Sequence, residues 1–148
     1  MRAIDTNILA RFYVEDEQDK EAAKQRQIAR RVMEHTPALF VPKTVVLELE
    51  WVMRGFYEFA PSAIADALEN LLGLPNVTVE DHPSVAAAVG HLRRGLDFAD
   101  ALHLAASRGC TELLTFDRRR FAARARRLGL KPACTVPALP LRKERTSR

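Results

Sequence analysis

Residues 1–9 read Met-Arg-Ala-Ile-Asp-Thr-Asn-Ile-Leu, and in this stretch a short apolar segment runs directly into a polar triplet. The segment from Arg2 to Ile4 is typical of a strand, and an amphipathic helix is expected to enter at Asn7. Asp5 therefore follows the end of a strand. In open parallel sheets, ligands and reacting groups gather at this edge. The stretch predicts a strand–helix unit that carries a carboxylate at its functional edge.

The alternation of strand and helix continues along the chain. Further strands are expected at 38–41, 77–79, 113–116 and 133–136, and helices at 17–34, 42–59, 62–72, 83–92, 97–108 and 119–128. Such alternation predicts an α/β fold, with a central parallel sheet of about four to five strands and helices on both faces. A chain of 148 residues suits one domain. We expect this domain to span residues 1–136, followed by a basic, disordered tail over 137–148.

Three further segments place carboxylates inside apolar frames, at residues 46–51, 97–103 and 113–117. Asp117 directly follows the predicted fourth strand, as Asp5 follows the first, so we expect the two to meet at one edge of the sheet. Lone buried carboxylates are costly. Several that converge suggest a shared hard cation, because Mg²⁺ and similar ions prefer oxygen ligands.

The helix predicted from residue 42 carries two candidates, Glu48 and Glu50, of which only one can face a buried site. At about 100° per residue they point to nearly opposite sides. Glu50 stands four residues before Arg54, which is typical of a solvent-side ion pair. Glu48 shares a largely apolar stripe with Val45 and Trp51. We therefore predict Glu48 as the site residue.

Asp97 and Asp100 begin the next acidic segment and favour different roles. Asp97 suits the N-cap of a helix that we expect to end at Gly109. Asp100 lies in the first turn, where the helix dipole favours negative charge, and it borders the apolar face. We predict Asp97 as a cap that also supports the site, and Asp100 as a ligand. Thr6 and Asn7 are either ordinary helix-entry residues or supports for Asp5.

Charge is distributed unevenly along the chain. Residues 117–148 carry eleven Lys/Arg and two acids, for a net charge of +9, whereas residues 1–116 carry twelve and seventeen, for −5. The basic part includes Arg118, Arg119 and Arg120, directly after Asp117. A basic surface beside an acidic centre suits a phosphodiester substrate, and we expect these arginines to contact the backbone of that substrate. A solvated helix face is the alternative.

Several classes of protein are disfavoured. The two cysteines form no CxxC pair and the four histidines no HxxxH pair, so neither a disulfide framework nor a zinc site is indicated. A nucleotide switch would need a P-loop, which is absent. A haloacid dehalogenase-type phosphotransferase would need a second Asp at the position of Asn7. The start lacks an apolar signal core, so we expect a cytoplasmic protein with no membrane span.

With these motifs in view, the chain resembles the PIN-domain ribonucleases, in particular the toxins of VapBC-type toxin–antitoxin pairs. The order and spacing of Asp-Thr-Asn, Glu-Leu-Glu-Trp-Val, Asp-Phe-Ala-Asp-Ala-Leu-His-Leu-Ala and Thr-Phe-Asp carry the resemblance. It implies an endoribonuclease that hydrolyses RNA phosphodiesters with Mg²⁺ or Mn²⁺. It also implies a small cognate antitoxin and a homodimer.

The resemblance places the acidic site on four residues, supported by two more. Direct metal ligands would be Asp5 and Asp100, ligands acting directly or through water Glu48 and Asp117, and supporting residues Thr6 and Asn7. A catalytically weak relative that binds RNA, or acts as a co-repressor with an antitoxin, is the alternative. The aromatic residues 51, 56, 57 and 59 suggest a groove for an antitoxin segment, or else plain core packing.

Overall fold

The computed structural model describes residues 1–139, so most of the predicted tail lies outside the described residues. The predicted alternation of strands and helices is confirmed. In chain order the elements are β1 (Arg2–Ala3), α1 (Thr6–Tyr13), α2 (Lys20–His35), β2 (Leu39–Val41), α3 (Lys43–Gly55), α4 (Pro61–Gly73), β3 (Val77–Val79), α5 (His82–Arg93), α6 (Phe98–Ala106), β4 (Glu112–Leu114), η1 (Arg118–Ala122), α7 (Ala123–Arg127) and β5 (Ala133–Thr135).

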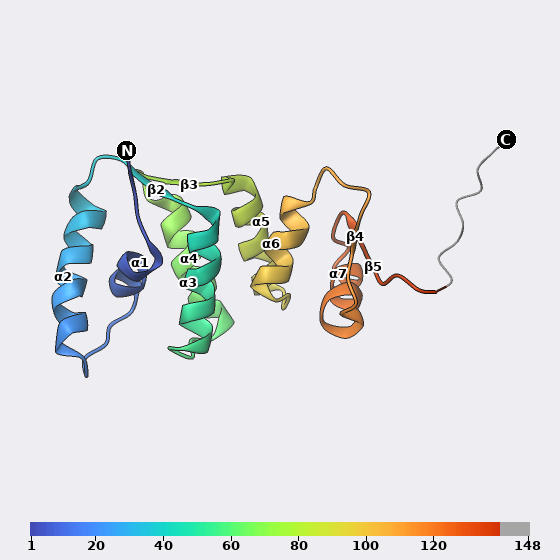
Figure 1. Ribbon diagram of the computed structural model, residues 1–148, viewed down its shortest axis with the longest axis horizontal. Helices are drawn as coiled ribbons and strands as arrows, with labels where there is room; N and C mark the ends of the chain where they lie inside the picture. Colours follow the sequence, from blue (N-terminus) through green and yellow to red (C-terminus); the bar gives the residue numbers. More distant parts are fainter. Residues whose placement is uncertain (140–148) are drawn as a thin grey trace.

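The strands form two sheets instead of the single central sheet that the sequence predicts. One sheet has the order β1-β2-β3 and the other is the pair β4-β5. All pairings are parallel, as expected. Figure 1 shows the elements in a row, with α2 and α1 at one end, α3 to α6 in the middle, and β4, β5 and α7 at the other end. The prediction of one sheet is therefore wrong, because β1 and β4 do not pair.

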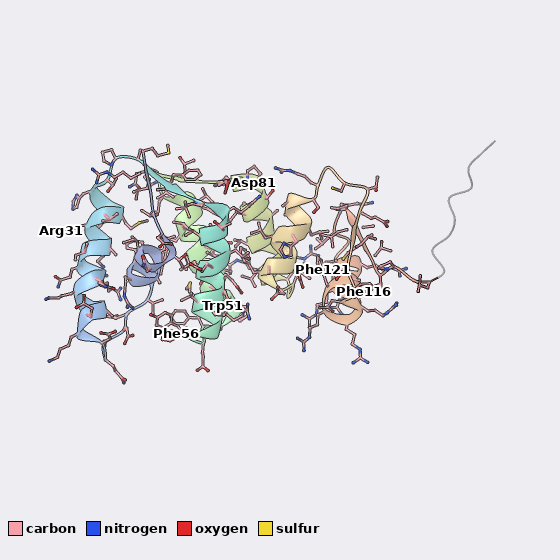
Figure 2. The ribbon with its side chains drawn as sticks, in the orientation of Figure 1. Arg31, Trp51, Phe56, Asp81, Phe116 and Phe121 are labelled. Atoms are coloured by element: carbon pink, nitrogen blue, oxygen red, sulfur yellow. The ribbon has the colours of Figure 1, made fainter. Side chains whose placement is uncertain are left out.

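The core runs along this row of elements. β2 lies in the middle of its sheet, and its Leu39 and Val41 are completely buried. Helix α5 packs against α4 and α6, and α3 packs against α1, α4 and α6. Phe121 and Ala125, from η1 and α7, join the same apolar cluster as Phe98. Figure 2 shows Phe121 between α6 and α7, so the C-terminal sheet and its helix are attached to the rest through this contact.

Helix ends follow the expected chemistry in most places. Asp19 caps α2 by accepting hydrogen bonds from two backbone N–H groups. Gly129 follows α7 with a φ of 68°, a conformation that glycine adopts without strain. The predicted end of α6 at Gly109 is wrong. The helix ends at Ala106, where the Ser107 hydroxyl donates to the carbonyl oxygen of His103 at 2.7 Å and competes with a further helical turn.

Among residues 1–139, the structure contains no helix with the length and apolar character that crossing a membrane requires.

The aromatic cluster after the middle of α3 is divided between surface and core. Trp51 and Phe56 are 61% and 74% exposed, and Figure 2 shows both at the lower end of α3. Tyr57 and Phe59 pack against the core, with their rings stacked at 6.3 Å. The core-packing interpretation therefore holds for the second pair, whereas the first pair lies on the surface.

Candidate active site

A pocket of about 620 Å³ lies where α3, the start of α6 and η1 come together. We call it the acidic pocket. Four acidic side chains and three arginines are among the residues that line it: Glu50, Asp97, Asp100, Asp117, Arg54, Arg120 and Arg124. These acids come from three segments that are far apart in the sequence. Two of the four predicted site carboxylates, Asp100 and Asp117, are therefore brought together.

Asp100 is the electrostatic centre of this pocket. Burial raises the pKa of the Asp100 carboxyl above its ordinary value, and the charges of Asp97 and Asp117 raise it further, while His103 acts in the opposite direction. Burial also raises the pKa of the Cys134 thiol on β5, and the charges of Asp100 and Asp117 add to this shift. Asp97 and Asp117 therefore lie close enough to Asp100 to raise its pKa, and Asp100 and Asp117 lie close enough to Cys134 to raise the pKa of its thiol.

Asp97 and Asp117 are both positioned as helix caps. The Asp97 carboxylate accepts from the backbone N–H of Asp100 at 3.2 Å, which confirms the predicted cap. Asp117 accepts from the backbone N–H of Arg120 at 2.9 Å, and its own N–H donates to the Thr115 hydroxyl at 3.0 Å. These bonds fix both carboxylates beside Asp100. Asp97 and Asp117 can therefore each cap a helix and line the acidic pocket at the same time.

On α3 the structure brings Glu50, not Glu48, into the acidic pocket. The buried face of α3 is Val46, Leu49, Glu50 and Met53, a helical spacing that places Glu50 in the core stripe. The predicted ion pair with Arg54 is present at 2.7 Å, but the Glu50 side chain is only 3% exposed, so its predicted solvent-side position is wrong. The apolar residues at 46, 49 and 53 were the sequence signal for this face.

Glu48 lies on a different surface of the same helix. It is exposed and lines a neighbouring hollow of about 420 Å³ together with Trp51 and Ala99. This hollow shares Glu50 and Arg54 with the acidic pocket. The stripe from which we chose Glu48 is only half-buried, because Val45 is partly covered and Trp51 faces solvent. A role for Glu48 in the reaction stays a prediction.

The structure does not bring Asp5 to the acidic pocket. Asp5 is exposed and caps α1, where its carboxylate accepts from the Thr6 N–H at 2.7 Å. Asn7 is exposed, whereas Thr6 is buried and its hydroxyl has no hydrogen-bond partner within the described chain. The expected meeting of Asp5 with Asp117 is absent, because β1 and β4 belong to different sheets at opposite ends of the row in Figure 1.

The donors of the acidic pocket fit a hard cation in kind but not in number. Their oxygens are the ligands that Mg²⁺ and Mn²⁺ prefer. Within residues 1–139, however, no three side chains of His, Cys, Asp or Glu lie close enough together to hold a metal ion. Glu50 is already engaged by Arg54. The described residues of one chain therefore do not form a complete site for a metal ion.

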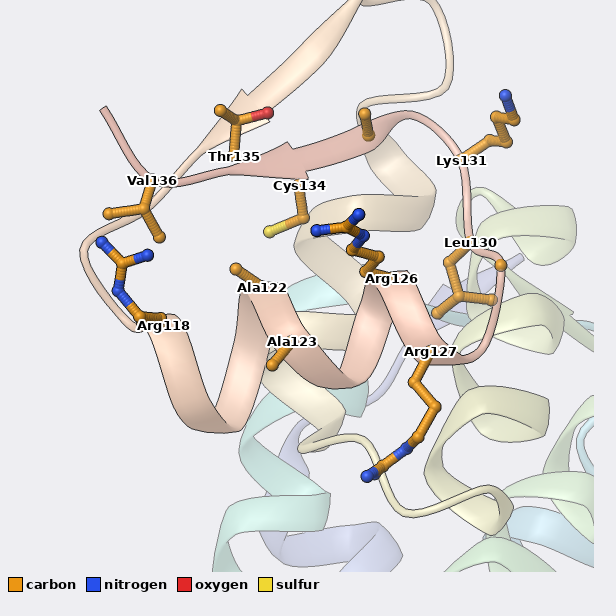
Figure 3. A pocket seen from close by; sticks show the side chains of 12 residues that line it. Arg118, Ala122, Ala123, Arg126, Arg127, Leu130, Lys131, Cys134, Thr135 and Val136 are labelled. Carbon is orange, nitrogen blue, oxygen red and sulfur yellow. The ribbon is translucent and has the colours of Figure 1, made fainter. Parts of the chain in front are cut away.

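A second hollow of about 870 Å³ lies behind η1 and α7, against β5. We call it the basic groove. Its floor is apolar, formed by Ala122, Leu130 and Cys134 among others. Figure 3 shows Arg118 at one end of the groove and Arg126 beneath β5. Neither arginine forms an ion pair with any residue between 1 and 139.

The three consecutive arginines predicted to contact RNA are divided by the helix that carries them. Arg118 lines the basic groove and Arg120 lines the acidic pocket. Arg119 is exposed and lines neither. Arg124, one turn after Arg120, also lines the acidic pocket, and Arg126, about two turns after Arg118, also lines the basic groove. Helix η1–α7 therefore separates the two hollows and presents cations to both.

A search of curated proteins finds no match to the chain. The PIN domain family model matches residues 3–127, a region that includes every element from β1 to α7 except the first residue of β1. Proteins with this domain are generally nucleases, and hence hydrolases. The match covers most of the sequence and includes η1–α7, the helix that lies between the two hollows. The chain therefore belongs to the PIN domain family.

Proposed function

We propose that the protein is an endoribonuclease that depends on Mg²⁺ or Mn²⁺ and serves as the toxin of a type II toxin–antitoxin pair. The observation that carries the proposal is the acidic pocket, where Asp100 is crowded by Asp97 and Asp117 beside a helix rich in arginine. Like charges at this spacing favour a bound cation. The basic groove on the other side of that helix supports a polyanionic substrate.

The chain's own residues divide the work of hydrolysis. Asp100 and Asp117 would hold the cation. The family resemblance also implies Asp5 and Glu48, neither of which lines the acidic pocket. When bound, a divalent cation polarises a phosphoryl oxygen and lowers the pKa of water. Arg120 and Arg124 line the same pocket and would offset the charge of the phosphate. Asp97 would hold the first turn of α6 so that Asp100 keeps its place.

A cleavage assay tests the reaction directly. Purified protein should cut RNA with Mn²⁺ or Mg²⁺ present and stop when EDTA is added. Asp100→Asn should abolish cleavage under the same conditions. Cleavage that continued at full rate in chelator would contradict the metal mechanism. Sequencing the 5′ ends of RNA after induced expression would then identify the target.

A second candidate function is RNA binding without cleavage, or co-repression with an antitoxin. The observation that favours it is the lack of three converging ligands within residues 1–139. In this case RNA would bind with an ordinary salt dependence. No Mn²⁺-dependent cut would appear at any protein concentration.

The antitoxin is proposed to bind near the exposed aromatic residues of α3. Trp51 borders the hollow that Glu48 lines, and Phe56 borders a second hollow with Glu15 and Asp16. Exposed apolar side chains at a groove are typical of helix-binding sites. The toxin and the product of a neighbouring gene should therefore copurify. Trp51→Ala should weaken this complex, whereas Ile28→Ala on α2, equally apolar and 59% exposed, should not.

A further inference from the structure

No carboxylate lines the basic groove, in contrast to the acidic pocket on the other side of η1–α7. Its charged side chains are all cations: Arg118, Arg126, Arg127 and Lys131. All of them are exposed, and none takes part in an ion pair between residues 1 and 139. The charge of the groove therefore favours a polyanion.

The floor of the groove offers a second kind of surface. Ala122 on η1, Leu130 after α7 and Cys134 on β5 make this floor apolar. Burial raises the pKa of the Cys134 thiol, so the thiol is uncharged at neutral pH and does not repel an anion. The volume of about 870 Å³ lies in the range of pockets that enclose an organic group. A phosphate backbone alone would leave the apolar floor in water.

Arg126 connects the cations of the groove with its apolar floor. Figure 3 shows the Arg126 guanidinium beside the Cys134 thiol, between α7 and β5, whereas Arg118 lies at the end of the groove. A guanidinium is planar, so it can stack on a flat ring while it carries charge. An RNA base can be stacked in this way when it is unpaired and turned outward. The groove therefore combines cations for phosphates with a flat, partly apolar surface for a base.

We propose that the basic groove binds an unpaired nucleotide of the RNA, with its base stacked on the Arg126 guanidinium over the apolar floor and its phosphates on Arg118 and Lys131. The inference rests on the proposed nuclease function and adds to it a preference for single-stranded RNA. Helix η1–α7 lies between this groove and the acidic pocket, so the bound nucleotide is separate from the bond that is cut.

Two oligonucleotides of equal charge test this binding mode. One is a fluorescent oligoadenylate of about 12 nucleotides, within the usual size of a single-strand binding site. The other is the same ribose–phosphate chain without bases. Fluorescence anisotropy in EDTA, which prevents metal-dependent cleavage, should show about tenfold weaker binding of the abasic chain, because about 60 Å² of apolar surface stays uncovered. Equal affinities would overturn the proposal.

Two arginine variants locate the base within the groove. Arg126→Lys keeps the charge and removes the planar group. It should therefore bring the affinity ratio of the two oligonucleotides close to one without changing the salt dependence. Arg118→Lys, the same exchange at the end of the groove, is the matched control and should leave the ratio unchanged. A ratio that persists in Arg126→Lys, or falls equally in Arg118→Lys, would overturn the proposal.

Filling the floor gives a test that leaves every arginine in place. Ala122→Leu should remove most of the difference between the two oligonucleotides, because the larger side chain occupies the space of the base. Cys134→Leu fills the same floor from β5 and is the second variant, used if thermal melts show that Ala122→Leu is unfolded. Ala23→Leu, at an exposed position of α2, is the control and should keep the ratio. A folded filling variant that keeps the ratio would overturn the proposal.

An acidic peptide is the other class of polyanion that could enter the groove. Polyglutamate of matched charge should displace the oligoadenylate no better than the abasic chain does. Displacement by polyglutamate as strong as by unlabelled oligoadenylate would show recognition of charge alone and would overturn the proposal. All these measurements are made without cleavage. A wild type that fails to cut RNA would therefore contradict the proposed function, while the affinity ratio still decides the role of the groove.

Discussion

Asp97 and Asp100 are three residues apart at the start of α6, yet they have different environments and different roles. Asp97 accepts a backbone hydrogen bond and so stabilises the helix. Asp100 accepts no such bond among the described hydrogen bonds and is crowded by two other carboxylates. A carboxyl group whose folded pKa is raised destabilises the fold when it ionises. Asp97 therefore raises the free energy of unfolding, whereas ionised Asp100 lowers it.

We expect the two residues to respond oppositely to substitution. Asp97→Ala should lower the free energy of unfolding by about 1 kcal/mol through loss of the cap. Asp100→Asn should abolish cleavage and leave metal-free stability unchanged or higher, because it removes a repelled charge. Mg²⁺ should then stabilise the wild type more than Asp100→Asn. Thermal melts with and without Mg²⁺ measure both effects. A far lower metal-free melting temperature for Asp100→Asn would show a structural role.

The two glutamates of α3 offer a second contrast at this scale. Glu50→Ala should cost about 1–3 kcal/mol, because the buried Glu50 side chain and its part-buried hydrogen bond to Arg54 are lost. Glu48→Ala should change stability by less than about 0.5 kcal/mol, as is usual for exposed positions. Urea unfolding measures these differences. The isosteric variants Glu50→Gln and Glu48→Gln, assayed for cleavage, then show which glutamate the reaction needs.

At the scale of elements, η1–α7 joins the two hollows. Its first turn is π-helical, with the Ala122 N–H donating to the carbonyl oxygen of Asp117 five residues earlier. This element carries arginines that line both the acidic pocket and the basic groove. Sequence spacing treats Arg118 to Arg120 as one basic run, whereas the helix sends their side chains to different places.

Substitutions in the basic groove should weaken RNA binding without changing the cut site. Arg118→Gln with Arg126→Gln should flatten the dependence of log K on log[salt] by about 0.7 for each lost phosphate contact on single-stranded RNA. The matched control is Arg30→Gln with Arg31→Gln, two exposed arginines of α2 that remove the same charge. Fluorescence anisotropy at several salt concentrations measures the slope. Equal slopes for the two variants would show that the arginines of the basic groove do not contact RNA.

Asp81 links three other elements of the middle of the molecule. Its carboxylate contacts Lys43 at the start of α3 and Arg108 after α6, at 3.1 and 3.2 Å. A hydrogen bond from Ser84, then Lys43, holds the pKa of Asp81 below its usual value. Figure 2 shows Asp81 beside the start of α5.

This lowered pKa predicts a loss of stability in acid. The stabilisation is present above the unfolded-state pKa of about 3.9 and is lost as pH falls through the lower folded value. Asp81→Asn keeps a residue that tolerates the observed φ of 50° and removes the charge. Between pH 6 and pH 3, the melting temperature of the wild type should therefore fall more than that of Asp81→Asn. Parallel curves for the two proteins would exclude this contribution.

At the scale of the whole molecule, local order was predictable and long-range pairing was not. Each strand and helix was expected within a few residues of its place, because periodicity and caps are local signals. The split of the sheet depends on which strand edges meet, and β1 and β4 are more than 100 residues apart. The site shows the same limit of sequence-based prediction. Asp100 and Asp117 line one pocket, as predicted, whereas Asp5 does not line it.

Positive and negative charges are distributed unevenly along the molecule. Residues 117–139 carry seven Lys/Arg and one acid, for a net charge of +6, while residues 1–116 carry −5. Figure 1 places residues 117–139 at one end of the row of elements, so the positive charge of the described chain is concentrated at that end. A polyanion would exert a torque that turns the basic end toward it during diffusion. Approach to RNA would thus be oriented before contact, with the acidic pocket carried along on the leading end.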